Sequence, residues 1–539
     1  MSLPGLELTQ ATVEERSKPA APVQHSLSRG SEWRFEVAFG QIVRVKLLAG
    51  TAELFGTELA ASQTYTFSGT KAAIYTWHGC TLEVSAGDPI AIGGLGSTPP
   101  SPGSGSGGCQ VEYIAEETPM AEYVNIHAAL ETMREEAKAA GCEGPRVLIL
   151  GPEDAGKTSL TKILTGYATK RDRQPVVVNL DPSEGMLSVP GSLTATAFRS
   201  MIDVEEGWGS SPMSGPSPIP VKLPLVYFYG LSSPLDAEGQ LYKPIVSRLA
   251  LAVAGRLVED TDAKEAGIII DTPGILGQGE GRRCYSSYYY RVFSPSTLDH
   301  ISVVKVTKSG GSVDRDASFM KNVREWQMRS YFFGNPIPSI ASSALSLSAT
   351  SSGTTISLSP HAQQLDFDSL SIYTITATSD DDDEYDPSSF SVNGSSFLPG
   401  GIHDHDNGTN PQTQQQLQQS IDPTTASSSL LPIPGLSSAS TTSPSSPLHA
   451  YIPLKKLPPS TISPIPLALE NTLLAVTHAA PNAPLNEIRD ASVMGFVYVA
   501  SVDEKKAKIR VLAPVGGRVP GRAMIWGKKW PGELVGLVG

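Results

Sequence analysis

Residues Gly151–Thr158 have the types and spacing that bind a phosphate chain. They read Gly-Pro-Glu-Asp-Ala-Gly-Lys-Thr and fit the pattern G-x-x-x-x-G-K-[ST]. Glycines let successive backbone N–H groups curve around an anion, and the positive end of the following helix adds to the attraction. In this pattern Lys157 reaches the β- and γ-phosphates, and the Thr158 hydroxyl coordinates Mg²⁺. The loop therefore predicts nucleotide binding.

The segments on either side match the strand and helix that such a loop requires. An apolar run at Val147–Leu150 precedes it, and Leu160, Ile163 and Leu164 follow at the spacing of an apolar helix face. Because the pattern alone occurs by chance in long chains, this context carries much of the prediction. An ordinary glycine-rich turn between a strand and a helix is the less favoured interpretation.

Asp181 is the first of two aspartates that could face the same phosphates. It ends the apolar run Val176–Leu180, and the carboxyl end of a parallel strand beside a phosphate loop faces the γ-phosphate. A carboxylate there can orient Mg²⁺ or accept the proton of an attacking hydroxyl. The alternative is a solvated aspartate that caps the turn containing Pro182.

Asp271 is the second aspartate, and it follows the apolar run Ile268–Ile270 in the usual position of an aspartate linked to Mg²⁺. Asp271-Thr-Pro-Gly274 also matches the D-x-x-G switch of GTPases. GTPases recognise guanine through a later N-K-x-D or T-K-x-D motif, and Thr307-Lys-Ser-Gly310 lacks its aspartate. Guanine specificity therefore has little support.

Residues 309–315, Ser-Gly-Gly-Ser-Val-Asp-Arg, precede a helical segment of mixed charge and could form a lid over the phosphates. An arginine in such a lid neutralises charge that develops on a transferred phosphoryl group. Arg315 is the candidate for this role. For Arg324 and Arg329, a solvated helix face is the better interpretation.

The composition excludes several functional classes. The net charge of the 539 residues is −13, so no global positive field attracts nucleic acid or membranes, and any RNA contact needs a local patch. Four cysteines without metal-ligand spacing suit a reducing compartment. The polar N-terminus differs from a signal peptide, and no apolar run approaches transmembrane length. We therefore expect a soluble intracellular protein.

The pattern of apolar residues predicts three domains. After a flexible arm, residues 1–30, short alternating runs punctuated by glycines predict a small N-terminal β-sandwich over residues 31–120. Continuous apolar runs separated by helical stretches predict an α/β domain with a parallel sheet over residues 121–337. Its expected strands are 147–150, 176–180, 225–228, 267–270 and 301–306.

The last part of the chain mixes low-complexity and ordered patterns. Residues 338–357 and 376–449 are rich in Ser, Thr, Pro and Gln and cannot bury enough apolar surface to offset the entropy of ordering. We expect a disordered linker and a disordered insert, respectively. Residues 358–375 and 450–539 are expected to form a small C-terminal α+β domain. Its clearest strands are Met494–Val499 and Ala507–Leu512.

Nine segments are similar to segments of a known family and occur in the same order along the chain. They are Glu32–Val37, Gly50–Leu59, Thr76–Cys80, Gly151–Thr158, Asn179–Pro182, Val189–Gly191, Asp203–Gly207, Lys308–Gly311 and Tyr331–Gly334. Together they resemble the Clp-type ATP-binding subunits of the pre-mRNA cleavage and polyadenylation machinery, within the polynucleotide 5′-hydroxyl-kinase family. The stretches Glu-Leu-Phe-Gly-Thr-Glu-Leu and Trp-His-Gly-Cys are more specific than the phosphate loop. The pair Asp181-Pro182 resembles the fungal branch.

The resemblance implies a P-loop domain that holds ATP and Mg²⁺ between N- and C-terminal domains. Glu32 and Lys71 would contact the adenine side. The phosphates would be bound by Asp154, Ala155, Gly156, Lys157, Thr158 and Ser159. The candidate metal ligands are Thr158, Asp181 and Asp271. The resemblance also implies a nuclear location, a larger cleavage-factor scaffold subunit and other 3′-end processing subunits as partners, indirect or weak RNA contact, and no membrane.

Active kinases of this family transfer the γ-phosphate of ATP to an RNA 5′-hydroxyl, with an aspartate at Asp181 as base and two lid arginines, the first at Arg315. Here Ser183 and Glu184 replace Gly and Gln, and the second arginine falls on Met320. A glutamate places negative charge near a polyanionic substrate, and loss of a transition-state arginine costs about 10³ in rate. We therefore expect a scaffold for cleavage and polyadenylation whose ATP is not turned over.

The alternative is an active RNA 5′-hydroxyl kinase in which Lys321 replaces the missing arginine, and a GTPase switch is a remote third. Between Gly274 and Ser309 the family has a helix, a buried strand and another helix. Here a short stretch rich in Arg and Tyr, Gly281–Tyr290, leaves one central strand unaccounted for. If this shortened form is real, we expect a poorly stable sheet.

Overall fold

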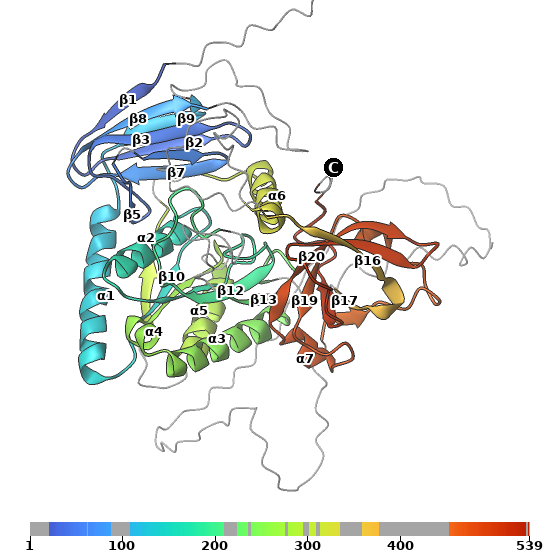
Figure 1. The fold of residues 1–539 in the computed structure, drawn as a ribbon. Coiled ribbons are helices and arrows are strands. Elements are labelled where there is room, and N and C mark those ends of the chain that lie inside the picture. The colour runs from blue at the N-terminus through green and yellow to red at the C-terminus, as the bar shows by residue number, and fades with distance from the viewer. Residues whose placement is uncertain are drawn as a thin grey trace, which may run out of the picture. The chain divides into compact units, whose positions relative to one another are not determined.

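The structure is a computed structural model that describes residues 21–61, 63–87, 108–209, 224–235, 239–274, 279–294, 301–308, 313–334, 358–376, 452–534 and 537 (Figure 1). The predicted fold class is confirmed, since a β-sandwich, a central α/β domain and a third domain built on one sheet follow each other along the chain. The expected linker 338–357 and, apart from Thr376, the expected insert 376–449 lie outside the described residues.

The N-terminal domain consists of two sheets packed face to face. One has the order β1 (Val23–Leu27), β8 (Cys80–Ala86), β3 (Val43–Gly50) and β6 (Thr64–Phe67), and the other β5 (Thr57–Glu58), β4 (Glu53–Leu54), β7 (Thr70–Tyr75), β2 (Glu32–Val37) and β9 (Val111–Ala115). Alternate side chains of β2, β3 and β8 enter the core, where the rings of Trp33 and Phe35 stack with centroids 4.4 Å apart.

The prediction of a flexible arm over residues 1–30 is wrong for residues 23–27, which form β1. Residues 23–27 pair antiparallel with β8, and Leu27 is buried in the sandwich core. The sequence Val-Gln-His-Ser-Leu has little apolar character of its own. Its strand conformation therefore depends on pairing with a partner far along the chain, which a local pattern does not reveal.

The central sheet has the order β13 (Leu225–Phe228), β12 (Ser192–Ala197), β11 (Val176–Asn179), β14 (Ile268–Asp271), β10 (Arg146–Leu150) and β15 (Ile301–Lys305). All five predicted strands are present. The sheet also contains β12, which runs antiparallel between β11 and β13, while the other described strands are parallel to one another. The sheet is therefore mixed at one side and parallel where the phosphate loop leaves it.

Helices cover both faces of this sheet (Figure 1). One face packs on α1 (Met120–Ala140) and α2 (Lys157–Lys170), and the other on α3 (Tyr242–Glu259) and α5 (Gly279–Phe293). The short α4 (Thr261–Ala266) leads into β14. Burial on both faces explains why these strands read as continuous apolar runs.

The stretch rich in Arg and Tyr, 281–290, lies in α5. The hydroxyl of Tyr289 lies 2.7 Å from that of Tyr242 on α3, and Tyr285 packs beside both rings. Helix α5 and strand β15 together occupy the shortened interval, and the tyrosines enlarge the core on that face. The expectation of a poorly stable sheet stays a prediction.

The C-terminal domain is a single sheet of order β16 (His361–Asp366), β21 (Lys508–Ala513), β20 (Val493–Asp503), β19 (Leu473–Thr477), β22 (Ala523–Trp526), β17 (Ser371–Ile375) and β18 (Leu454–Lys456). Helix α7 (Leu485–Arg489) joins β19 to β20. Residues 358–376 supply β16 and β17, and residues 452–534 supply the remaining strands. Helix α6 (Ala317–Phe333) precedes this domain and packs Tyr331 against Phe496 of β20.

Helix α2 also carries a close contact with the N-terminal domain. Gly56 has φ +84°, and a Cβ there would lie 2.9 Å from the Cα and carbonyl oxygen of Ile163. Beside it, the Tyr167 hydroxyl donates to the Glu53 carboxylate, and the Thr57 hydroxyl donates to the carbonyl oxygen of Ile202 at 3.2 Å. The hairpin β4–β5 is thus fixed against the helix that begins at the phosphate loop.

We predict that Gly56→Ala lowers the free energy of unfolding by about 3 kcal/mol, from the strain of a positive φ and from the backbone clash with α2. The matched control is Gly141→Ala, since Gly141 has φ +65° with nothing within 4 Å of an added Cβ. The control should lose only the strain, about 1 kcal/mol. Equal losses in chemical denaturation would show that the contact with α2 contributes nothing.

Candidate functional site

The loop between β10 and α2 has the backbone conformation of a phosphate cradle. Gly156 has φ +89°, and a Cβ at Gly151 would lie 2.6 Å from the carbonyl oxygen of Val306. Asp154 adopts φ +55°, in the left-handed region that favours glycine. The Lys157 ammonium folds back and donates to the carbonyl oxygen of Pro152 at 2.8 Å. The sequence motif therefore marks a real loop of the predicted kind.

Asp271 lies beneath the first turn of α2. Strand β14 pairs with β10 so that Asp271 is opposite Ile149, and the Thr158 hydroxyl donates to Asp271 Oδ2 at 2.7 Å. Its other oxygen, Oδ1, is buried without a hydrogen-bond partner among the described residues. Burial raises the pKa of Asp271 to about 7, although the bond from Thr158 acts to lower it.

These two oxygen groups suit a hard divalent cation. Mg²⁺ is bound in proteins by one or two carboxylates together with phosphate oxygens of the substrate. No group of three or more His, Cys, Asp or Glu side chains in the described part of the chain forms a metal site by itself. A cation at Thr158 and Asp271 would therefore depend on the phosphates of a nucleotide for further ligands.

Asp181 follows β11, one strand away from Asp271. Its Oδ1 accepts from the backbone N–H and the hydroxyl of Ser183, at 2.9 and 2.6 Å, so Asp181 does cap the following turn. The side chain still faces the phosphate loop, and burial raises its pKa above the usual value. The Trp530 indole of the C-terminal domain donates to the carbonyl oxygen of Pro182 at 3.3 Å, which ties this turn to that domain.

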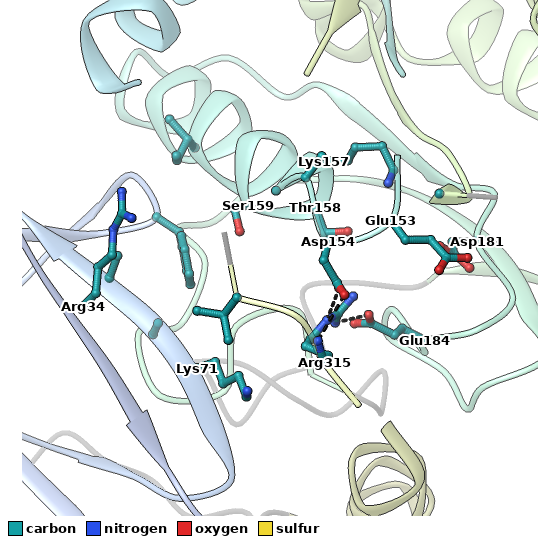
Figure 2. Close-up of a pocket in the computed structure, with 18 of the residues that line it drawn as sticks. Arg34, Lys71, Glu153, Asp154, Lys157, Thr158, Ser159, Asp181, Glu184 and Arg315 are labelled. Atoms are coloured by element: carbon teal, nitrogen blue, oxygen red, sulfur yellow. Dashed lines mark hydrogen bonds and ion pairs between the residues drawn. The ribbon is translucent and has the colours of Figure 1, made fainter. Parts of the chain in front are cut away.

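Arg315 is held between two carboxylates (Figure 2). Its Nε lies 2.7 Å from Asp154 Oδ1, and its Nη1 donates to Glu184 Oε1. Although burial acts to lower the pKa of Arg315, the charges of Glu184 and Asp154 raise it above its usual value. The expected negative charge of Glu184 is thus paired with Arg315, and its effect on a polyanionic substrate stays a prediction.

The N-terminal domain forms the opposite wall. Glu32 is buried and pairs with Arg34, and burial raises the pKa of Glu32 despite that neighbour. Lys71 lies 3.0 Å from Glu36 and donates to the carbonyl oxygen of Asp314 at 3.4 Å. Figure 2 shows Arg34 and Lys71 on the sheet that faces the phosphate loop.

A cavity of about 550 Å³ lies between these walls. Almost every site residue predicted from the sequence lines it, namely Glu32, Lys71, Asp154, Ala155, Gly156, Lys157, Thr158, Ser159, Asp181 and Arg315. Asp271 is the exception, since it is buried behind Thr158 and reaches the cavity through that hydroxyl. The structure thus brings together residues from two domains around one phosphate loop.

Comparison with known proteins gives the same outline. Three family profiles match in order: "N-terminal beta-sandwich domain of polyadenylation factor" over residues 26–137, "mRNA cleavage and polyadenylation factor CLP1 P-loop" over 151–298 and "Pre-mRNA cleavage complex II protein Clp1" over 358–532. The mRNA cleavage and polyadenylation factor CLP1 of Coccidioides immitis is 65% identical, with all of both chains aligned. That of Aspergillus fumigatus is 62% identical over the same full extent.

The chain belongs to the CLP1 family of mRNA cleavage and polyadenylation factors. Among solved structures it shares its fold with a chain of a wild-type Clp1p–Pcf11p complex, at a TM-score of 0.66 and 23% identity over 94% of this chain and 97% of that one. A second complex of the same two proteins, described with a structural basis for ATP loss in a point mutant, matches with a TM-score of 0.67.

Sequence reasoning missed Arg324, which it assigned to a solvated helix face. Arg324 lines the cavity, one helical turn beyond Met320, and its guanidinium lies 4.5 Å from the centroid of the Trp530 ring. The i, i+4 spacing from Met320 was the available signal. Lys321, in contrast, has a side chain 68% exposed and lies 4.0 Å from Glu325, so it is a poor substitute for a lid arginine.

Glu205 is a further buried carboxyl group near the site. It lines a neighbouring cavity of about 300 Å³ between the two domains and accepts from the backbone N–H of Thr66 at 2.6 Å. Burial raises its pKa to about 7, and the charges of Asp203 and Glu206 add to the effect. Because the folded protein keeps this proton to higher pH than the unfolded chain, Glu205 makes stability fall as pH rises from about 4.5 to about 7.

We predict that Glu205→Gln removes this part of the pH dependence. Between pH 5 and pH 8 the variant should lose less thermal stability than the native protein, because its neutral amide has no proton to release. Glu135→Gln, at an exposed position of α1, is the control and should follow the native profile. Melting temperatures at both pH values test this, and parallel profiles for native protein and Glu205→Gln would contradict it.

Proposed function

We propose that this protein is an ATP-binding scaffold subunit of a nuclear pre-mRNA cleavage factor, needed for endonucleolytic cleavage and polyadenylation of mRNA 3′ ends. In this role it holds ATP and Mg²⁺ without transferring phosphate. The observation that carries the proposal is the contrast within one cavity: the residues that hold a nucleotide are complete, whereas the lid groups that would act on the γ-phosphate are engaged elsewhere or replaced.

The residues that would bind the nucleotide support ATP as the ligand. The loop Gly151–Thr158 supplies backbone N–H groups and Lys157 for the phosphates, and Glu32 and Lys71 lie across the cavity where the resemblance puts adenine. Thr158 and Asp271 would hold Mg²⁺, which supplies charge neutralisation of the phosphates, and the unpartnered Oδ1 of Asp271 is available for this. The D-x-x-G match of Asp271–Gly274 does not by itself favour guanine.

The lid supports holding without transfer. The Arg315 guanidinium donates hydrogen bonds to Asp154 and Glu184. Met320 occupies the position at which active kinases have the second arginine. Asp181, in the position of the base, is occupied on one oxygen by Ser183. Each of these features reduces the positive charge or the proton acceptor that the site can supply to stabilise a phosphoryl-transfer transition state.

The relatives support the partner and the location. Those from Coccidioides and Aspergillus carry the name mRNA cleavage and polyadenylation factor. The solved chains of the same fold come from complexes of Clp1p with Pcf11p. We infer that this chain likewise binds a larger cleavage-factor subunit in the nucleus, with RNA contacted weakly or through partners. No helix in the described ranges is both long and apolar enough to cross a bilayer.

We predict that the purified protein contains adenine nucleotide and no guanine nucleotide, and that Lys157→Ala weakens ATP binding by about 10- to 100-fold. The loss follows from about 1.5–3 kcal/mol for hydrogen bonds to charged groups. Lys138→Ala, on an exposed face of α1, is the control and should bind ATP normally. Chromatography of released nucleotide and titration calorimetry test both points. An empty native protein that does not bind ATP would overturn the proposal.

An active polyribonucleotide 5′-hydroxyl kinase is the second candidate, favoured by Asp181 beside the phosphate loop and by Arg324 in the cavity wall. We predict no Lys157-dependent transfer of radiolabelled γ-phosphate to a 5′-hydroxyl oligoribonucleotide. The double variant Met320→Arg/Glu184→Gln should gain activity, because it restores an arginine and relaxes the hold on Arg315. Robust transfer by the native protein, unchanged in the double variant, would favour the kinase.

A further inference from the structure

Residues Val313–Asp316 form a short strap that leads into α6 across the phosphate loop. Asp154 binds the strap with both carboxylate oxygens, since Oδ2 accepts from the Arg315 backbone N–H at 3.1 Å and Oδ1 accepts from Arg315 Nε at 2.7 Å. From the N-terminal domain, Lys71 donates to the carbonyl oxygen of Asp314 at 3.4 Å. The strap is therefore tied to the loop that holds the phosphates and to the wall expected to face adenine.

Glu184 completes this set of contacts from a third element, the turn after β11. Its carboxylate accepts from Nη1 of Arg315, so one guanidinium joins the phosphate loop to that turn. The side chains of Arg315, Glu184 and Asp154 are 33%, 27% and 15% exposed, so water screens these bonds only in part. A charged pair of this kind is about twice as strong as a neutral hydrogen bond.

The strap is continuous with the start of α6, which makes its own contacts with the N-terminal domain. Asp316 caps the helix by accepting from the backbone N–H of Phe319 at 2.7 Å. The Phe319 ring then lies 5.5 Å from that of Phe39 and 5.0 Å from the Lys71 ammonium, both in the N-terminal domain. Opening the strap would therefore separate these contacts as well as those of Arg315.

We propose that Glu184 and Asp154 hold Arg315 as a latch that keeps the strap closed and slows the release of nucleotide from the cavity. Val313, Arg315, Asp154 and Glu184 all line that cavity, so the latch borders the space that a nucleotide must leave. The latch rests on the proposed ATP binding. It gives a physical role to a glutamate where active kinases have glutamine: the charge that opposes transfer strengthens retention.

The test is the dissociation rate of radiolabelled ATP, chased with excess unlabelled ATP, from the full-length protein. Glu184→Gln keeps the size of the side chain and removes its charge, and it should raise the dissociation rate about tenfold, equivalent to about 1.4 kcal/mol. Glu184→Asp keeps the charge with a shorter reach and should give an intermediate rate. Glu325→Gln, on α6 outside the latch, is the matched control and should release ATP at the native rate.

A double-mutant cycle with Arg315→Gln separates the latch from a direct effect of Glu184 on the phosphates. If the latch acts through Arg315, Glu184→Gln should have no further effect in the Arg315→Gln background. An unchanged or slower release from a folded, ATP-binding Glu184→Gln protein would overturn the latch and leave the proposed function standing. Failure of the native protein to bind ATP at all would remove the proposed function instead.

Discussion

The hydrogen bond from the Thr158 hydroxyl to the Asp271 carboxylate is the contact on which the rest of the site depends. It joins the first turn of α2 to the end of β14, the strand between β10 and β11. A buried carboxylate with one oxygen unpartnered costs free energy in the absence of a ligand. The strand order therefore places, directly under the phosphate loop, a group that a cation with its phosphates would satisfy.

The balance of charge around this point supports the proposal that the site holds a nucleotide without reacting with it. Asp154, Asp181, Glu184 and Asp271 all lie near the loop. Burial raises the pKa of Asp181 and of Asp271, and the charge of Glu184 adds to both shifts. Arg315 is engaged by two of the four, so its charge is already compensated. Lys157 and the backbone N–H groups remain to meet the phosphates. A site of this kind attracts a cation together with the nucleotide more readily than a free polyanion.

The parts of the site that were predictable are those encoded by local pattern. The phosphate loop and the five apolar strands read directly from the sequence because their spacing reflects burial on both faces of a sheet. Strand β12 was not predicted, since Ser-Leu-Thr-Ala-Thr-Ala lacks the continuous apolar run of the other central strands. Its residues alternate between polar and apolar, yet nearly all of them are buried, because β12 lies between β11 and β13. The guanidinium of Arg324 contacts Trp530, which belongs to another domain, so the sequence offered only the i, i+4 spacing from Met320 as a local signal.

The contacts of helix α2 give a physical reason why a bound nucleotide would stabilise a scaffold. Its N-terminus forms part of the phosphate loop, while its side, at Ile163 and Tyr167, packs against the hairpin of the N-terminal domain. The same helix thus forms part of one wall of the cavity and contacts the domain that forms the other. A ligand that binds only the closed arrangement stabilises it by mass action. An ATP held between Lys71 and Lys157 would therefore fix the relation of two domains, and a partner that recognises both would bind a surface already in place.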